Sequence, residues 1–118
     1  MLGFKMNDIS GHLENIVFLE LCARGFKVSI GKLNEYEIDF IATKNNQQLY
    51  IQVAYLLADQ KTVDREFGAL EKINDNYPKI VLSLDKFLDQ NRNGIQWYNL
   101  IDFLLHDQDT LAGSEWIN

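Results

Sequence analysis

Three side chains in this sequence have the types and the spacing to bind a divalent cation: Glu14, Asp39 and Gln52. Carboxylate and amide oxygens are ligands of hard cations such as Mg²⁺, whose coordination is usually completed by water and a substrate phosphate. Glu14 belongs to a predicted helix, whereas Asp39 and Gln52 belong to two predicted strands. The alternative is structural, with Asp39 and Gln52 as a cross-strand hydrogen-bonded pair and Glu14 paired with a lysine or arginine.

The two strands are predicted to form a β-hairpin that sets Asp39 against Gln52. Polar and apolar residues alternate on both sides of an Asn-Asn pair at 45–46, and asparagine tolerates the positive φ of a two-residue type I′ turn. With this pair as the loop, Asp39 falls opposite Gln52, and Glu37 falls opposite Ala54. Because the side-chain period of a strand is two, we expect all four residues to share one face.

Two longer helices are predicted on either side of the hairpin. The first runs from about Leu13 to Leu21, is capped by asparagine, aspartate or serine at 7–10, and ends before Gly25. Glu14 falls at the shoulder of its apolar stripe. The second helix is predicted over Thr62–Asn74, with Thr62 as its cap.

The remaining pattern predicts three further strands, a turn and a short helix. The strand at Ile80–Leu84 is apolar enough to be buried on both faces. The sequence pattern also predicts strands at Phe26–Ile30 and Ile95–Leu100, a polar turn at Asp89–Gly94, and a short helix at Ile101–Leu105. We predict one domain over residues 1–106, followed by a tail over 107–118.

Composition excludes several classes of function. The net charge is −6, so DNA binding would require a local basic patch. The sequence has no phosphate-cradling glycine loop, no cysteine and histidine spacing suited to zinc, and no nucleophilic serine elbow. It also lacks an apolar run of roughly 20 residues and a secretion signal, which favours a cytoplasmic protein without a membrane partner.

The order of predicted elements resembles the PD-(D/E)XK, or restriction-endonuclease-like, fold. This fold is α/β, with a mixed sheet and the order α-β-β-β-α-β, here followed by a short strand and helix. Five segments further resemble the C-terminal domain of unknown function of prokaryotic AAA+ ATPases, over about residues 2–105. These segments are Gly11–Val17, Glu37–Phe40, Ile51–Tyr55, Arg65–Phe67 and Asp75–Lys79.

The resemblance implies a role for each candidate residue. Glu14 matches the helix glutamate and Asp39 matches the central metal-binding aspartate. Gln52 stands where a second acidic ligand is usual, and Ala54 stands where active members carry a lysine that orients the attacking water. An amide brings no charge and an alanine stabilises none, so we expect weak binding of Mg²⁺ or Mn²⁺.

A lysine or arginine at another position of the sequence could take the role of the missing lysine. Lys61 and Arg65, at the start of the second predicted helix, are the candidates. The alternative for them is a solvated helix end and an intrahelical ion pair.

These observations favour a nuclease-like accessory or interaction domain with a degenerate site. Its expected partner is the ATPase domain of the same parent chain, and the abrupt start at Met1 fits a piece cut from a longer protein. Two alternatives stay open: an active Mg²⁺-dependent DNA endonuclease with Glu14, Asp39 and Gln52 as ligands, and a purely structural interaction module. An edge strand or the last helix could support a homo-oligomer.

Overall fold

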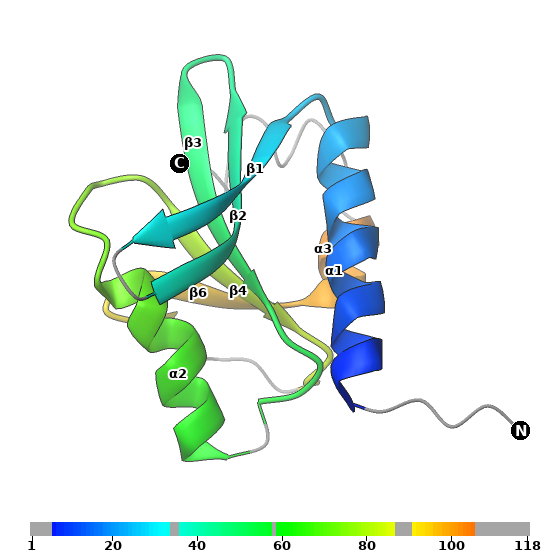
Figure 1. Ribbon diagram of the computed structural model, residues 1–118, viewed down its shortest axis with the longest axis vertical. Coiled ribbons are helices and arrows are strands. Elements are labelled where there is room, and N and C mark those ends of the chain that lie inside the picture. Colours follow the sequence, from blue (N-terminus) through cyan, green and yellow to red (C-terminus); the bar gives the residue numbers. More distant parts are fainter. Residues whose placement is uncertain (1–5, 34–35, 58, 87–90, 106–118) are drawn as a thin grey trace, which may run out of the picture.

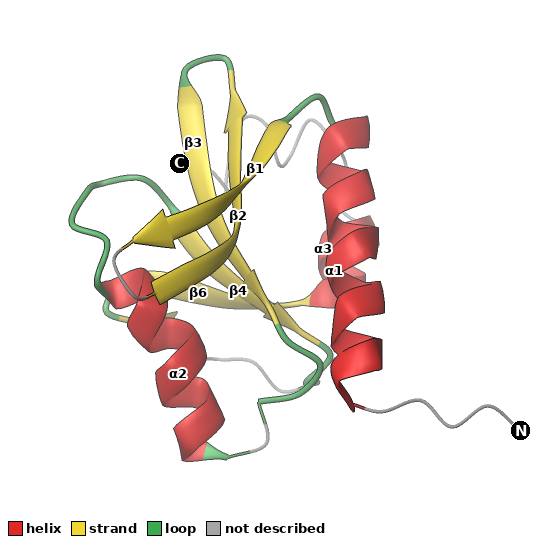
Figure 2. Cartoon of the chain, viewed as in Figure 1, coloured by secondary structure: helices red, strands yellow, loops and turns green. Residues whose placement is uncertain are grey.

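The computed structural model describes residues 6–33, 36–57, 59–86 and 91–105, which form one mixed α/β unit (Figures 1 and 2). The elements follow in chain order as α1 (Met6–Ala23), β1 (Lys27–Leu33), β2 (Tyr36–Lys44), β3 (Gln47–Val53), α2 (Gln60–Glu71), β4 (Lys79–Ser83), β5 (Asn91–Arg92), β6 (Ile95–Asn99) and α3 (Leu100–Leu105). The predicted order α-β-β-β-α-β, with a later strand and short helix, is confirmed.

One six-stranded sheet carries the fold, in the order β1-β2-β3-β4-β6-β5. Neighbouring strands from β1 to β3 run antiparallel, as do β5 and β6. Strand β4 runs parallel to both β3 and β6. Strand β3 is therefore where the sheet changes from antiparallel to parallel pairing.

The helices cover both faces of this sheet (Figure 1). Helices α1 and α3 cover one face, over a core that we call the α1-side core: Val17, Leu21, Phe26, Phe40, Ala42, Leu49, Ile51, Val53, Ile80, Leu82, Leu100 and Phe103. Helix α2 covers the other face, over the α2-side core: Ile38, Tyr50, Ala54, Leu57, Phe67, Ala69, Leu70, Val81 and Ile95. Strand β4 contributes to both cores, so its predicted burial on two faces is confirmed.

The predicted hairpin register is confirmed from the turn to Phe40, and the ladder ends before the predicted pairs Asp39–Gln52 and Glu37–Ala54. Asn45 and Asn46 both adopt positive φ, at 52° and 66°, as a type I′ turn requires. The paired positions run from Lys44 with Gln47 to Phe40 with Ile51. The asparagine pair alone therefore fixes which residues of β2 and β3 meet.

A β-bulge in β2 interrupts the alternation beside the site. The β1–β2 register changes between Ser29, which pairs with Ile41, and Gly31, which pairs with Ile38. One residue of β1 thus opposes two residues of β2, Asp39 and Phe40. Such a bulge bends the strand and re-aims side chains. Accordingly, Ile38 packs in the α2-side core while Phe40 packs in the α1-side core.

Both long helices begin earlier than predicted. Helix α1 starts at Met6, so the expected capping residues at 7, 8 and 10 lie inside it, and that prediction is wrong. Helix α2 is capped by Asp59, whose side chain accepts a hydrogen bond of 2.8 Å from the Thr62 backbone N–H. Thr62 is therefore a residue of the first turn and not the cap, because Asp59 satisfies the orphan donor. The helix ends at Glu71, before the predicted Asn74.

Of the predicted turn at 89–94, residues 89–90 lie outside the described residues, and the rest is only partly a turn. Asn91 and Arg92 form β5, and the turn itself is Asn93-Gly94, with φ of 52° and 84°. The predicted tail at 107–118 lies outside the described residues. Within the residues that are described, none of the helices is long and apolar enough to cross a membrane.

Candidate functional site

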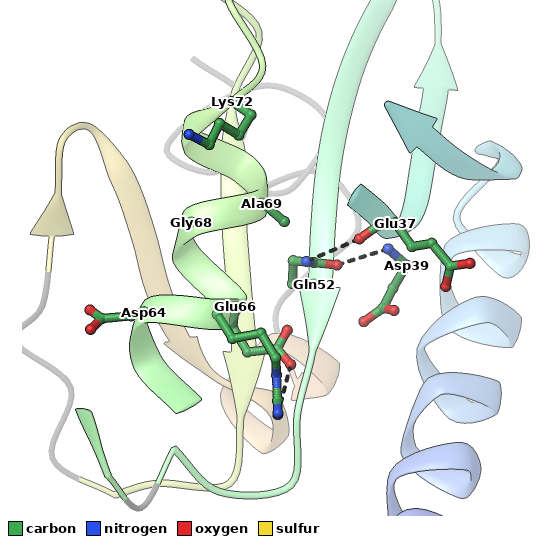
Figure 3. A pocket seen from close by; sticks show the side chains of 9 residues that line it. Glu37, Asp39, Gln52, Asp64, Glu66, Gly68, Ala69 and Lys72 are labelled. Atoms are coloured by element: carbon green, nitrogen blue, oxygen red, sulfur yellow. Dashed lines mark hydrogen bonds and ion pairs between the residues drawn. The ribbon is translucent and has the colours of Figure 1, made fainter. Parts of the chain in front are cut away.

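Strands β2 and β3 separate beyond the pair Phe40–Ile51, and the side chains of Asp39 and Gln52 fill the opening (Figure 3). The Gln52 Oε1 atom accepts a hydrogen bond of 2.8 Å from the Asp39 backbone N–H. In return, Asp39 Oδ2 accepts one of 2.8 Å from the Val53 backbone N–H. Side-chain oxygens thus replace backbone acceptors where the ladder ends. The predicted hydrogen-bonded pair of Asp39 and Gln52 is present, between the backbone N–H of Asp39 and the side chain of Gln52.

Gln52 is buried, with 4% of its surface exposed. Its Nε2 atom reaches the Glu37 carbonyl oxygen at 3.5 Å. The amide therefore spans a donor and an acceptor of β2 that would otherwise be buried without a strand partner. Its geometry is that of a structural bridge, because the oxygen proposed as a metal ligand already accepts the Asp39 N–H.

Glu37 does not share the polar face that the alternation predicts. Its side chain is exposed and points away from Gln52, and only its carbonyl group reaches the amide (Figure 3). The bulge beside Asp39 is the physical reason, since it breaks the period of two between Glu37 and the hairpin. That part of the prediction is wrong.

Carboxylates from both sides of the sheet approach Asp39. Burial is the main cause that raises the Asp39 pKa; the Val53 hydrogen bond opposes it, and the charge of Glu37 adds to it. Glu14 is half-buried on α1, as its place beside the apolar stripe predicts. Its pKa is raised by burial and then by the charge of Asp39, so the two carboxylates interact.

Glu66 of α2 is a member of this group that the sequence reasoning missed. Its pKa is raised to about 7, first by burial and then by the charge of Asp39; Arg65 lowers it and Glu14 raises it further. The signal was present in the sequence. Glu66 stands three residues after Val63 and four before Leu70, at the shoulder of the α2 apolar stripe.

Asp39 and Glu66 border a pocket of about 580 Å³ between α2 and the opening in the hairpin, and Glu14 is not among its lining residues (Figure 3). Its lining residues are Glu37, Asp39, Gln52, Asp64, Arg65, Glu66, Gly68, Ala69 and Lys72. Of the two proposed substitute cations, Arg65 lines the pocket and Lys61 does not. The Arg65 side chain is 71% exposed, and its Nη2 atom lies 3.8 Å from Glu66 Oε1. The expected intrahelical ion pair is therefore present, between adjacent residues.

Ala54 lies under α2 and not on the pocket wall. It is 7% exposed and packs with Leu57, Phe67 and Leu70 in the α2-side core. Its backbone N–H donates to the Leu82 carbonyl at 2.9 Å, which continues the pairing with β4. A methyl group suits this packed position, and Ala54 is part of the core.

The donor set suits a hard cation only in part. Among the described residues, no three histidine, cysteine, aspartate or glutamate side chains lie close enough together to bind a metal ion. Mg²⁺ can be held by one or two carboxylates and several waters, and Asp39 with Glu14 or Glu66 offers such a pair. The Gln52 oxygen already accepts the Asp39 N–H, so one of its two lone pairs is in use.

Comparison with known proteins finds relatives of unknown role. A stretch of 105 residues, 88% of this chain, is 41% identical to an uncharacterized protein of Haemophilus influenzae. A stretch of 64 residues, 51% of the chain, is 44% identical to the uncharacterized protein MJ1544 of Methanocaldococcus jannaschii. The matched regions span only 25% and 14% of the lengths of these proteins. No protein-family model matches the sequence.

Proposed function

We propose that this chain is a nuclease-like accessory domain of the PD-(D/E)XK type, with a degenerate metal site, that serves a longer prokaryotic ATPase. The order of elements supports the nuclease-like origin. The charge interactions of Asp39 with Glu14 of α1 and with Glu66 of α2 support it further.

One observation carries the degenerate reading. Gln52 Oε1 lies 2.8 Å from the Asp39 N–H and Asp39 Oδ2 lies 2.8 Å from the Val53 N–H, so both residues help to hold the two strands together. Ala54 supports the same reading, because it is buried in a core and offers no charge to a phosphate. A site whose polar groups are used for strand pairing has lost much of what metal-assisted hydrolysis requires.

The accessory role is supported by the relatives. Both matched proteins are much longer than the matched region, in one bacterium and one archaeon. A domain that recurs inside longer prokaryotic proteins is expected to act together with the remainder of those chains. The ATPase identity of that remainder rests on the resemblance described above.

A second function, an active Mg²⁺-dependent DNA endonuclease, is favoured by Glu66. Its carboxylate adds to those of Glu14 and Asp39, and it can compensate for the charge that Gln52 lacks. Arg65, on the pocket wall, is the cation that would stand in for the lysine. In this reading Asp39 and Glu66 hold the cation, which supplies Lewis-acid chemistry when bound.

Incubation of the purified domain with supercoiled plasmid and Mg²⁺ or Mn²⁺ separates the two functions. The degenerate reading predicts no nicking at any metal concentration up to roughly 10 mM, well above the usual requirement of metal-dependent hydrolases. Metal-dependent nicking by the wild type that disappears in Asp39→Asn and in Glu66→Gln would establish the endonuclease. If metal neither shifts the melting temperature nor supports cleavage even after Gln52→Glu, the purely structural module is favoured.

A further inference from the structure

A second groove lies at the opposite end of the hairpin, around the Asn-Asn turn. It has a volume of about 730 Å³, and its wall includes Lys27, Thr43, Lys44, Asn45, Gln48 and Tyr77. We call it the hairpin-end groove. In Figure 1 the hairpin tip lies at the top of the molecule, whereas α2 lies in the lower half. The groove is therefore separate from the carboxylate site.

The charge of this groove is opposite to that of the protein as a whole. Among the described residues that line it, two are lysines and none is acidic, although the chain carries a net charge of −6. The Lys44 ammonium group is fixed at the rim, because it donates a hydrogen bond of 2.6 Å to the Arg24 carbonyl and lies 5.4 Å from the centre of the Phe26 ring. This is the local basic patch that binding of a polyanion would require.

Tyr77 is held by its backbone and by an edge-on contact of its ring with the Tyr50 ring, whose centre lies 6.4 Å away. The Tyr77 N–H donates to Asp75 Oδ1 at 3.0 Å, and its carbonyl accepts from Lys79 Nζ at 2.8 Å. Asp75 is fixed in turn by the Tyr50 hydroxyl at 2.6 Å and by Lys79 Nζ at 2.9 Å. Nevertheless 44% of the surface of Tyr77 is exposed. An aromatic ring that is ordered without being buried, on the wall of a groove, is available to stack on a ligand.

We propose that the hairpin-end groove binds single-stranded nucleic acid. Lys27 and Lys44 contact the phosphates, and a base stacks on the Tyr77 ring. The amide groups of Asn45 and Gln48 offer donors and acceptors for base edges. An acidic peptide would use the lysines and could pair with the amides through its backbone, but its acidic side chains would leave the Tyr77 ring without a stacking partner. The volume of the groove suits about two nucleotides, in keeping with a short site.

Fluorescence anisotropy with a labelled oligothymidylate of about 12 nucleotides tests this proposal on the whole chain. We expect a Kd of roughly 10–100 μM at low salt, as for a site with few phosphate contacts. Tyr77→Ala should weaken binding about tenfold, the effect of losing one stacked base, whereas Tyr77→Phe should retain it. Since the backbone holds the loop, neither substitution should prevent folding, and the melting temperature checks this.

The lysine variants separate specific contacts from general charge. Lys27→Gln should weaken binding and reduce the slope of log K against log salt by about 0.7, the value for one phosphate contact on a single strand. Lys32→Gln, the same change at an exposed position elsewhere on β1, should leave both unchanged. Three results would overturn the proposal: equal loss in both lysine variants, equal binding of duplex DNA, or full competition by a polyglutamate peptide.

Discussion

Asp39 and Gln52 bridge the two strands of the hairpin at the point where their ladder ends, each through a side-chain oxygen that accepts a backbone N–H at 2.8 Å. This arrangement satisfies backbone groups that the divergence of β2 and β3 would otherwise leave without partners. Both side chains therefore help to hold β2 and β3 together where the strands diverge.

Replacing Gln52 by alanine should destabilise the fold. The substitution removes the partner of the Asp39 N–H and of the Glu37 carbonyl, in a place from which water is largely excluded. A loss on the order of 2 kcal/mol is expected for buried polar groups left unsatisfied. Urea denaturation should show a midpoint lower by about 1 M. Gln47→Ala at the hairpin turn is the matched control, and an equal loss in both variants would contradict the bridging role.

Replacing Gln52 by glutamate should make stability depend on Mg²⁺. Without metal, the new carboxylate stands beside Asp39 and loses the donor to the Glu37 carbonyl, so the melting temperature should fall. Millimolar Mg²⁺ should then raise it by a few degrees, because the cation binds the native state and not the unfolded chain. Gln47→Glu carries the same charge and should show no such response. A melting temperature of Gln52→Glu that ignores Mg²⁺ would mean that no cation site can be restored here.

Adding Ala54→Lys to Gln52→Glu should bring a cation towards the two carboxylates, at a cost in stability. Ala54 packs against Phe67 and Leu70, so the longer side chain must displace its neighbours before its ammonium reaches the carboxylates. Overpacking of this kind costs about 1–3 kcal/mol. We therefore expect the double variant to bind Mg²⁺ more tightly than wild type in calorimetry while unfolding at lower urea. Tight binding with no loss of stability would show that Ala54 is not packed as described.

The sequence predicts the hairpin well because its turn has a strong local signal. Asn45 and Asn46 tolerate positive φ, and one loop position fixes every pair of the ladder. The bulge at Asp39 has no comparable signal in the sequence, because no residue type in β2 marks the position of the extra residue. The bulge is visible in the structure, where Ile30, the β1 residue opposite it, is 78% exposed although it is an apolar strand residue.

The candidate site is only partly predictable for a related reason. Glu14 and Asp39 follow from local patterns and from resemblance, whereas the role of Glu66 depends on how α2 packs across the sheet. The cap of α2 shows the same limit. Asp59 and Thr62 are both good capping residues three positions apart, and the contacts of the folded chain decide between them.

Gly31 offers a test of the bulge. A Cβ atom added there would lie 2.7 Å from Ile41 Cδ1 and 3.0 Å from Ile38 Cβ, closer than van der Waals contact allows. Gly31→Ala should therefore destabilise the protein by about 1–3 kcal/mol. Gly11→Ala is the contrasting change, because Gly11 lies within α1 with no atom close to the added methyl group. That variant should be more stable than wild type by about 0.5–1 kcal/mol in the same urea titration. A harmless Gly31→Ala would contradict the close approach of β1 and β2.

The raised pKa values of Glu66, Glu14 and Asp39 should make the free energy of unfolding fall as pH rises towards neutrality. Burial raises the Glu66 pKa to about 7 in the native state, against an ordinary value of 4.5. Between these values the native state binds a proton more tightly than the unfolded chain does, so the free energy of unfolding decreases with rising pH. The loss is complete only about one pH unit above 7, and it amounts to at most about 3–4 kcal/mol for this group. Glu14 and Asp39, whose pKa values are also raised, act in the same direction.

Glu66→Gln should remove most of this penalty. The variant should melt at a higher temperature than wild type at pH 8, and its melting temperature should depend less on pH between about 5 and 7. Glu71→Gln on the same helix is the control of opposite sign. The pKa of Glu71 is lowered by its hydrogen bond with Arg92, so the native state favours its charged form and the substitution should destabilise the protein at neutral pH. Equal behaviour of the two variants at pH 8 would refute the burial of Glu66, because burial, reinforced by the charge of Asp39, makes a neutral side chain preferable there.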